Sequence, residues 1–561
     1  MNAMNIPHKQ YDYVIVGAGS AGCVVANRLT EGGNKRVLLL EAGPKDNSVI
    51  LKMPAALGLP LVSKRYNWGF VSEPEPGLGG RVSDQHRGRV LGGSSSINGM
   101  VFVRGNALDY EGWAENGLAE WSYAHCLPYF KKMESFEGGV DEYRGGDGPL
   151  HVHKCRAENP LYQAFLGAGQ DYGLALTADQ NGYRQEGVNV AQATTYRGHR
   201  ESTATAYLKP AMKRPNLTVI TNIHVSRVEL SGNKAVGVRY LDGDKEIFVE
   251  AGDEVILCAG TFGTPQILML SGIGDAKELS RHEIDVKIHL PGVGADLQDH
   301  VAVPLQYTTK KPVSPTRELS RVGRLALGAR WLLTRSGLGA SNYFEVGAFF
   351  RGNEDVLYPN LQHEFFPMIG EFYRGEAIVK DGFQYFTSVM RPKSRGRVGL
   401  KSKDPKSDPK IQLNFLAAPE DMVEMIEGIQ KTHEMIKQKS WDHLRGVEIT
   451  PGSSNLSGAA LEAWVRANAG TGYHAVSTCR MGCDELAVTD SNGLVRGVEA
   501  LRIIDASLMP RIVTGNTNAP TIMMAEKLAD AVLGKRLAPM DAKFVGPARG
   551  SHVKNGALLS V

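Results

Sequence analysis

The chain has 561 residues, which exceeds the length at which one hydrophobic core stays compact, so we expect two domains. It carries 63 basic and 60 acidic side chains and a net charge of +3, which excludes the broad basic surface of a nucleic-acid-binding protein. Hydrophobic residues at 42% and charged residues at 22% are ordinary for a folded domain and exclude extensive disorder.

The N-terminal sequence MNAMNIPHKQ is polar and lacks the apolar core and cleavage site of a secretory signal. No run of about 18 apolar residues predicts a transmembrane helix. Six cysteines without disulfide or zinc-ribbon spacing fit a reducing compartment. We therefore expect a cytoplasmic protein, and the sequence leaves peripheral contact with the inner membrane and oligomerisation open.

The first element in chain order is the apolar run YDYVIV at residues 11–16, a pattern typical of a buried parallel strand. The turn GAGSAG follows, and the next stretch, CVVANRLTE, has apolar residues at helical spacing. Gly17 permits the turn, Gly19 lets the backbone approach a pyrophosphate, and Gly22 lets the helix pack against the strand. A phosphate would then lie at the helix N-terminus.

A second strand, RVLLLEAG, contains Glu41 about 20 residues beyond the glycine turn, at the ribose position of a dinucleotide site. A carboxylate there accepts hydrogen bonds from both ribose hydroxyls and repels a 2′-phosphate. These residues favour FAD or NAD over NADP and leave the choice between FAD and NAD open.

Two further glycine-rich segments follow. Residues 88–105, GRVLGGSSSINGMVFVRG, bring backbone donors and hydroxyls of Gly92, Gly93 and Ser94 close together, as an anion-binding nest requires, although flexible loops have the same composition. Residues 260–274, GTFGTPQILMLSGIG, form a glycine turn that enters a helix after the strand EVILCAG.

These two segments resemble, position by position, the two signature patterns of the glucose-methanol-choline oxidoreductases. The resemblance extends over nearly the whole chain through YDYVIVGAGSAG, LQDH at 297–300, SRGRVGLKS at 394–402, YHAVSTCRMG at 473–482 and the segment at 505–530. NYFE at 342–345 and VEITPG at 447–452 are most similar to bacterial choline dehydrogenases and aliphatic alcohol dehydrogenases of that family.

The resemblance implies FAD as the cofactor, with the first glycine turn and Glu41 on the ADP half, and Val225 beside the adenine. The FAD-binding residues that it implies are Gly17, Gly19, Ser20, Ala21, Gly22, Glu41, Ala42, Trp68, Arg89, Gly92, Gly93, Ser94, Asn98, Gly99, Met100, Val101, Val225, Tyr473, Asp505, Ala506, Asn516 and Thr517. Some relatives attach the flavin through a histidine immediately before the asparagine of the second segment. Ile97 occupies that position here, so we expect non-covalent FAD.

Oxidation of an alcohol removes a hydride from carbon and a proton from oxygen, and histidine is a suitable base near neutral pH. The resemblance assigns this role to His474, with hydride transfer to flavin N5. The second member of the family's pair precedes the C-terminal helix TIMMAEKLADAV, and the register indicates Asn516, with Asn518 as the weaker candidate. An amide is no base, but it can donate to the substrate oxygen and orient it. Asp505 and Ala506 resemble the segment that passes the flavin ring, and the alternative is a simple turn at the end of a strand.

The resemblance to choline oxidising members breaks at one position. These members carry a glutamate two residues after the LQDH histidine, whereas this chain has Ala302. A quaternary ammonium without a counter-charge loses its hydration at a cost of several kcal/mol. We therefore expect a neutral or anionic primary alcohol, unless Glu364 and a cation–π face on Trp68 compensate.

Two other patterns suggest sites that we reject or rank second. His151, His153 and Cys155 alternate as on one strand face, but no fourth ligand is nearby, so we expect no metal. Residues 321–335 combine arginines with leucines as in a membrane-facing amphipathic helix. A lid or packing helix over the substrate channel is favoured, because two glycines weaken a free-standing helix.

The expected fold class is α/β, or α+β overall, with a discontinuous Rossmann-like domain around FAD at residues 10–155, 215–310 and 465–540. A substrate domain at 156–214 and 311–464 would cover the flavin with an antiparallel sheet and would include a long helix at 419–438. Residues 541–561 are expected to form a weakly ordered tail.

The sequence thus predicts an FAD-dependent alcohol dehydrogenase, with oxidase activity not excluded and with a quinone, a cytochrome or oxygen as electron acceptor. Further oxidation of the aldehyde to the acid stays open. The alternatives are a choline dehydrogenase, a non-redox lyase of the family and a flavin-binding protein without activity. A lyase would show no flavin bleaching by alcohols, and a binding protein would lack the pair formed by His474 and Asn516.

Overall fold

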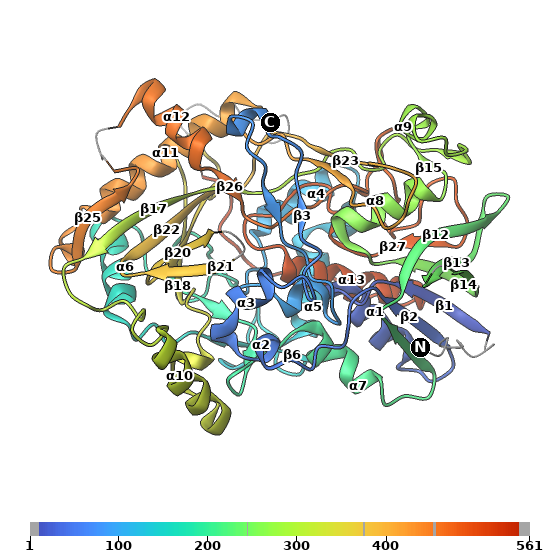
Figure 1. The fold of residues 1–561 in the computed structure, drawn as a ribbon, viewed down its shortest axis with the longest axis horizontal. Coiled ribbons are helices and arrows are strands. Elements are labelled where there is room, and N and C mark those ends of the chain that lie inside the picture. The colour runs from blue at the N-terminus through green and yellow to red at the C-terminus, as the bar shows by residue number, and fades with distance from the viewer. Residues whose placement is uncertain (1–9, 244, 374–375, 453–455, 549–561) are drawn as a thin grey trace.

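The computed structural model describes residues 10–243, 245–373, 376–452 and 456–548. Two seven-stranded sheets lie at opposite ends of an elongated molecule (Figure 1). Residues 1–9, on which the expectation about export partly depends, and tail residues 549–561 lie outside the described chain. None of the described helices is long and apolar enough to cross a bilayer.

The first sheet contains the dinucleotide-binding pattern. Its order is β11-β2-β1-β14-β13-β12, with β27 paired to β14, and its strands are β1 (Tyr11–Val16), β2 (Val37–Glu41), β11 (Leu217–Thr221), β12 (His224–Ser231), β13 (Lys234–Asp242), β14 (Lys245–Leu257) and β27 (Leu501–Ile503). Helix α1 (Ser20–Thr30) connects the parallel neighbours β1 and β2. The predicted strand, glycine turn, helix and second strand are confirmed.

The second sheet is antiparallel in all its pairings. Its order is β25-β17-β22-β19-β18-β7, with β26 paired to β17, and its strands are β7 (Gly187–Val190), β17 (Val301–Thr309), β18 (Val346–Phe350), β19 (Leu361–Phe366), β22 (Phe383–Val389), β25 (Arg445–Thr450) and β26 (Gly470–Thr471). Strand β17 lies in this sheet although the expected boundary followed it at residue 310. Strand β26 also lies here, because it pairs with β17.

Each sheet has its own buried hydrophobic cluster, and helices cover both. The other helices of eight or more residues are α4 (Ala107–Glu115), α5 (Tyr123–Met133), α6 (Pro160–Asp171), α8 (Gly260–Leu270), α10 (Arg321–Thr334), α11 (Pro419–Ile436), α12 (Gly458–Asn468) and α13 (Asn518–Val532). The helix expected at 419–438 and the C-terminal helix are therefore confirmed. Helix α13 packs against α1, where the guanidinium of Arg28 donates to the buried carboxylate of Glu526 at 2.8 and 2.7 Å.

The chain crosses between the two sheets at the segments that carry the predicted catalytic residues. His474 follows β26 closely, and Asn516 precedes α13 by two residues. The backbone amide of His474 donates to Asp299, which precedes β17, at 2.8 Å. Both catalytic candidates are thus held at the junction of the two sheets.

Two peripheral segments complete the fold. Helix α10 projects from the lower edge of the molecule below the second sheet (Figure 1). Residues 541–548 of the expected tail form no regular secondary structure and run along the surface, where the amide of Val545 donates to Tyr183 O at 3.2 Å.

Candidate functional site

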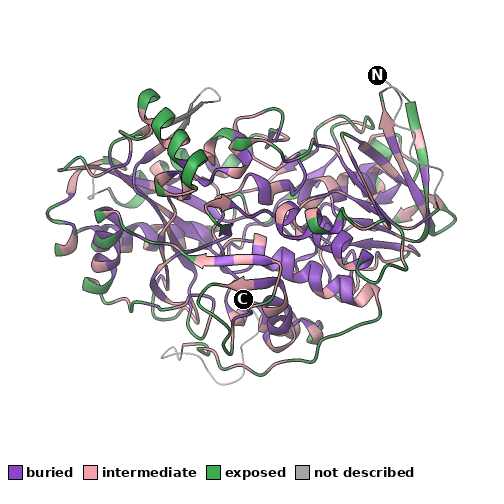
Figure 2. Cartoon of the chain, turned by 90° about the horizontal axis from the view of Figure 1, so that it is seen from below, coloured by how far each residue is buried: buried purple, intermediate pink, exposed green. Residues whose placement is uncertain are grey.

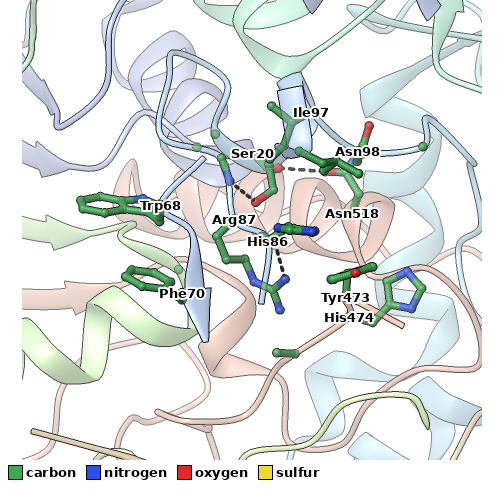
Figure 3. Close-up of a pocket in the computed structure, with 18 of the residues that line it drawn as sticks. Ser20, Trp68, Phe70, His86, Arg87, Ile97, Asn98, Tyr473, His474 and Asn518 are labelled. Atoms are coloured by element: carbon green, nitrogen blue, oxygen red, sulfur yellow. Dashed lines mark hydrogen bonds between the residues drawn. The ribbon is translucent and has the colours of Figure 1, made fainter. Parts of the chain in front are cut away.

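A cavity of about 770 Å³ extends from the glycine turn after β1 to His474 and Asn516. Its volume lies in the range of about 300–1,000 Å³ that is typical of ligand sites. Figure 3 shows Ser20 and Asn98 at one side of this space, Trp68 and Phe70 at another, and Tyr473 beside His474. The cavity therefore joins the dinucleotide end of the first sheet to the predicted catalytic pair.

The glycine turn forms the dinucleotide end of the cavity. Gly17 has a φ of +98°, and a Cβ there would lie 2.5 Å from Cys258 O. A Cβ on Gly22 would lie 1.9 Å from Gly17 O, so this position tolerates only glycine. A Cβ on Gly19 would meet only Cys258 O, at 3.9 Å. Gly19 therefore leaves its backbone open for the close approach of a phosphate.

Glu41 lies at the end of β2 and lines the same end of the cavity. Its carboxylate accepts from the amides of Ala18 and Gly43, each at 2.8 Å. A carboxylate has about four acceptor positions, so capacity remains for ribose hydroxyls. Burial raises the pKa of Glu41 to about 7, and the amides of Gly43 and Ala18 oppose this shift.

The second glycine segment packs directly against the first. Gly93 has a φ of +52°, and a Cβ there would lie 2.6 Å from Gly19 Cα. The preceding residue, Gly92, has a φ of +89° and no room for a Cβ beside Ser96. Ile97 is buried to 2% exposure and also lines the cavity.

Most residues of the predicted set line this one cavity. They are Gly17, Gly19, Ser20, Ala21, Glu41, Ala42, Trp68, Gly93, Ser94, Asn98, Gly99, Met100, Val101, Val225, Tyr473, Asp505, Ala506, Asn516 and Thr517, together with His474, Ala302 and Glu364. Gly22, Gly92 and Arg89 do not line it. Arg89 contacts Trp68, which does line the cavity, with its guanidinium carbon 5.0 Å from the ring centre.

Asp505 joins two segments of the cavity wall. Its carboxylate accepts from the amide of Gly260 at 2.9 Å and from the hydroxyl of Thr264 at 2.6 Å. It therefore fixes the start of α8 to the turn that contains Ala506.

His474 occupies the other end of the cavity. Its Nε2 lies 3.0 Å from Asn516 Nδ2, and its Nδ1 lies 3.0 Å from His300 Nδ1. Asn518, the weaker of the two amide candidates, instead accepts from the Ser20 hydroxyl at 2.8 Å, at the dinucleotide end. The structure thus brings together His474 and Asn516 but separates Asn518 from them.

The hydrogen bonds assign a tautomer to each histidine. His300 Nε2 lies 2.9 Å from Met390 O and 3.1 Å from Val513 O, and because carbonyls only accept, this nitrogen carries the proton. Neutral His300 then accepts through Nδ1, so His474 Nδ1 is the donor. Neutral His474 consequently presents an unprotonated Nε2 to Asn516 and to the cavity.

Burial keeps both rings neutral. It lowers the pKa of His300 to about 4. It also lowers the pKa of His474 well below 6.5, and the positive charge of Arg87 adds to this effect. A neutral imidazole with a free Nε2 is able to accept a proton from an alcohol.

Glu364 contacts the catalytic pair from the second sheet. Its Oε1 accepts from Asn516 Nδ2 at 3.0 Å, so that amide group donates one proton to Glu364 and the other to His474. Desolvation raises the pKa of Glu364, and the hydrogen bond from Asn516 opposes the rise. Side chains alternate along β19, and the neighbouring His363 points into the core, where its Nε2 lies 2.8 Å from Thr432 Oγ1.

The wall around Glu364 is apolar. Ala302 on β17 lines the cavity opposite Ser388 on β22, and Phe386 pairs with Glu364. The ring of Phe344 lies 6.4 Å from that of Phe386 and 5.1 Å from that of Phe366, and all three line the cavity. Ala302 brings no charge to this wall. The acidic residues that line the whole cavity within the described chain are Glu41, Glu364, Asp408 and Asp505.

The aromatic face formed by Trp68 lies away from His474. Trp68 stacks on Phe70 with ring centres 5.4 Å apart, on the opposite side of the cavity from His474 (Figure 3). The sequence proposed Trp68 both for FAD and for the substrate. The edge of the His224 ring, 6.1 Å from that of Trp68, belongs to the first-sheet end of the cavity.

The residues fit an elongated dinucleotide such as FAD. A Cβ would clash at Gly17, Gly22, Gly92 and Gly93, and the open backbone of Gly19 lines the cavity. The Nη2 of Arg87, a residue that lines the cavity, is buried without a hydrogen-bond partner among the described residues, as is Asn516 Oδ1. Buried polar atoms of this kind require a partner, which a bound ligand supplies. Ile97 provides no nucleophile for a covalent link.

Two residues near the catalytic pair received no role from the sequence. His300 is the last residue of LQDH, but nothing in this motif indicates that it contacts His474. Arg87 precedes the second glycine segment, and only the fold shows its guanidinium carbon 4.8 Å from the Phe262 ring, in the cavity wall. Burial lowers the pKa of Arg87.

The alternating residues of HVHKC have separate partners. His151 Nδ1 lies 2.8 Å from Glu201 Oε2, and the His151 ring stacks on Tyr196. His153 Nδ1 lies 3.0 Å from the Thr195 hydroxyl. Within the described ranges, no group of three His, Cys, Asp or Glu side chains is arranged to hold a metal ion.

Comparisons with known proteins identify extended similarities. Models of the GMC oxidoreductase family match residues 11–302 and 392–525. An oxygen-dependent choline dehydrogenase of Paraburkholderia phymatum is 47% identical over 564 residues, which cover 99% of either chain. Among solved structures, pyridoxine 4-oxidase from Mesorbium loti is 28% identical with a TM-score of 0.85, covering 94% of this chain and 100% of that one. A formate oxidase variant of Aspergillus oryzae RIB40, studied for FAD modification, is 29% identical with a TM-score of 0.88, covering 94% and 98%.

Proposed function

Because the chain belongs to the GMC oxidoreductase family and is an FAD-dependent alcohol oxidoreductase, we propose that it oxidises an uncharged primary alcohol to the aldehyde, with His474 as base and Asn516 as clamp. The observation that carries the roles of these residues is the pair of hydrogen bonds that leaves His474 Nε2 unprotonated beside Asn516 Nδ2. Bound FAD supplies the hydride acceptor.

His474 and Asn516 each form a different hydrogen bond with the substrate oxygen. An alcohol at this end of the cavity replaces the hydrogen bond between Asn516 and His474 with two of its own. Its hydroxyl donates to His474 Nε2 and accepts from Asn516 Nδ2, which orients the oxygen and fixes the carbon next to it. As the hydroxyl proton moves to Nε2, His474 becomes an imidazolium, whose Nδ1 proton remains hydrogen-bonded to His300.

The polarity of the wall supports an uncharged substrate. Ala302 provides no counter-charge, and the raised pKa of Glu364 favours its neutral acid, which is a hydrogen-bond donor without charge. A quaternary ammonium would lose its hydration against Phe344, Phe366 and Phe386 and recover only part of it.

Choline is the second candidate substrate. The relative that is 47% identical is named a choline dehydrogenase, and Glu364 together with phenyl rings is able to contact a trimethylammonium group if the carboxyl ionises. The choice between the two candidates depends on the charge of Glu364 in the complex.

A matched pair of alcohols tests this choice. Choline is compared with its carbon analogue, in which a tert-butyl group replaces the trimethylammonium group, by anaerobic loss of flavin absorbance in a stopped-flow experiment. We expect the uncharged analogue to bleach the flavin faster, and Glu364→Gln to leave that preference unchanged. Faster bleaching by choline that Glu364→Gln abolishes would instead establish choline as the substrate. If a wide panel of alcohols failed to bleach the flavin at all, alcohol oxidation itself would be refuted in favour of a lyase or a binding protein.

A second measurement identifies the electron acceptor. The alcohol that bleaches fastest is used to follow reoxidation by oxygen, by a water-soluble quinone and by a cytochrome in separate experiments. We propose that one of these three acceptors supports turnover at a rate comparable to bleaching. The product is assayed as aldehyde and as acid, which shows whether the oxidation continues.

A further inference from the structure

Helix α10 has a single fully buried side chain. Trp331 is 1% exposed, its indole Nε1 donates to Gly198 O at 2.7 Å, and the Arg335 guanidinium carbon lies 4.3 Å from its ring centre. The helix has 14 residues, and Trp331 is its sole buried residue. Gly323, Leu327 and Gly328 are half-buried, and the other residues of the helix are exposed.

The free face of this helix is apolar. Val322 is 78% exposed, Leu325 76%, Leu332 52% and Leu333 85%. Residues three, four or seven positions apart share one helix face, so Val322, Leu325 and Leu332 form a continuous stripe that Leu333 widens. Single exposed apolar residues are common on proteins, but a contiguous stripe on a projecting helix marks an interaction surface.

The same helix is strongly basic. Arg321, Arg324 and Arg330 are exposed, and residues 321–335 contain no acidic residue. These three arginines form no ion pair with any carboxylate in the described parts of the chain. Figure 2, which views the molecule from below, shows this helix mostly in the green of exposed residues, in contrast to the purple strands of the sheets.

We propose that α10 docks the protein on an anionic lipid bilayer. A short amphipathic helix with leucines on one face and arginines beside them binds in the headgroup region, where the leucines reach the acyl chains and the arginines meet lipid phosphates. With 14 residues the helix is shorter than the roughly 20 that a membrane-spanning helix requires, so it lies along the surface.

Docking by this helix also places the cavity close to the lipid. Arg324, Leu327 and Gly328 of α10 line the cavity, and so do Leu57 and Leu59. Given the proposed function, an alcohol or a quinone dissolved in the bilayer would reach the cavity beside α10. This consequence rests on the proposed function, whereas docking itself does not.

Vesicle flotation of the FAD-loaded full-length protein, without substrate, tests the docking. The vesicles contain phosphatidylcholine alone or equal parts of phosphatidylcholine and phosphatidylglycerol. We expect flotation with the anionic vesicles only, and we expect added salt to weaken it because salt screens the arginines. In Leu325→Asp/Leu333→Asp the bound fraction should fall at least ten-fold. In Arg321→Gln and in Arg330→Gln the affinity should fall about five-fold each, the contribution of one basic residue near an anionic surface.

A matched control is Val140→Asp, which changes a side chain that is 68% exposed outside α10. It should float as the unchanged protein does, and all variants should keep their FAD content and their bleaching by a soluble alcohol. Absence of flotation with anionic vesicles would overturn the proposal, as would flotation that survives Leu325→Asp/Leu333→Asp. A dimer in solution that this double variant dissociates would overturn it too, because the stripe would then be an interface between two copies of the chain.

Discussion

His300 Nδ1 lies 3.0 Å from His474 Nδ1, although the two residues are 174 positions apart in the sequence. His300 does not line the cavity, but it fixes the tautomer of the residue that does. The carbonyls of Met390 and Val513 hold the proton of His300 on Nε2. His300 is therefore a positioning residue that acts on the substrate through His474.

This relationship predicts the effects of two substitutions at position 300. His300→Leu removes the acceptor for His474 Nδ1, so Nε2 of His474 is protonated in part of the molecules, and flavin reduction should slow by at least about ten-fold. His300→Asn restores an acceptor near the position of Nδ1 and should recover much of the rate. FAD content and thermal stability are measured in parallel. Equal rates in both variants would show that the role of His300 is only structural.

The role of His474 as base predicts a large loss in His474→Ala. The variant should fold and bind FAD, and its rate of flavin reduction should fall by about two or more orders of magnitude, the usual contribution of a positioned base. Stopped-flow absorbance under anaerobic conditions measures this rate. Kinetics like those of the unchanged protein would place the base elsewhere.

Asn516→Ala should cost less than His474→Ala. The variant loses a donor to the substrate oxygen and the hydrogen bond to Glu364, but it keeps the proton acceptor. Asn518→Ala is the matched comparison, because Asn518 contacts Ser20 and not His474. Asn518→Ala should weaken FAD retention more than the chemical step. A larger kinetic loss in Asn516→Ala than in His474→Ala would contradict the proposed roles.

The side chain at position 97 predicts that FAD is released intact. The purified protein should be yellow, and precipitation with acid should leave the flavin in the supernatant, because Ile97 has no nucleophilic atom. The supernatant is measured by flavin absorbance and the pellet by fluorescence. Flavin that remained with the precipitated polypeptide would show that another residue forms a covalent link.

The buried His363 predicts a specific dependence of stability on pH. Burial lowers the pKa of His363 to about 3, while the unfolded chain takes up the proton near pH 6.5. Between pH 6.5 and pH 3 the unfolded state binds more protons than the folded state. The free energy of unfolding therefore decreases as the pH falls below 6.5, by about 1.4 kcal/mol per pH unit. Buried carboxyls with raised pKa values, such as Asp299 at about 6, act in the opposite direction, so a variant must isolate this effect.

The pH effect is measured as the difference in thermal midpoint between the unchanged protein and His363→Gln. Relative to the variant, the unchanged protein should lose stability as the pH falls from 7 towards 4. His443→Gln, at an exposed position, is the control. A difference that stayed constant over this range would show that His363 is protonated in the folded protein.

Local sequence determined the dinucleotide end of the site. A buried strand, a turn that only glycine can form and a helix at apolar spacing are properties of neighbouring residues, so β1, α1 and Glu41 were all predictable from about 40 positions. The register of the C-terminal helix indicated Asn516 in the same way, but it left Asn518 as an alternative. The domain boundary after residue 310 stays a prediction, and the sequence did not reveal that β17, which precedes it, pairs with β22 and β25 far along the chain.

Only the tertiary structure decided how the catalytic end is assembled. His300, Glu364, His474 and Asn516 come from four separate segments, and no spacing in the sequence encodes their contacts. The tautomer of His474 depends on carbonyls of Met390 and Val513, which every residue possesses and which no side-chain pattern reveals. Chemistry that depends on local backbone geometry can be predicted from the sequence, whereas the protonation of a side chain depends on distant groups that meet only when the sheets pack.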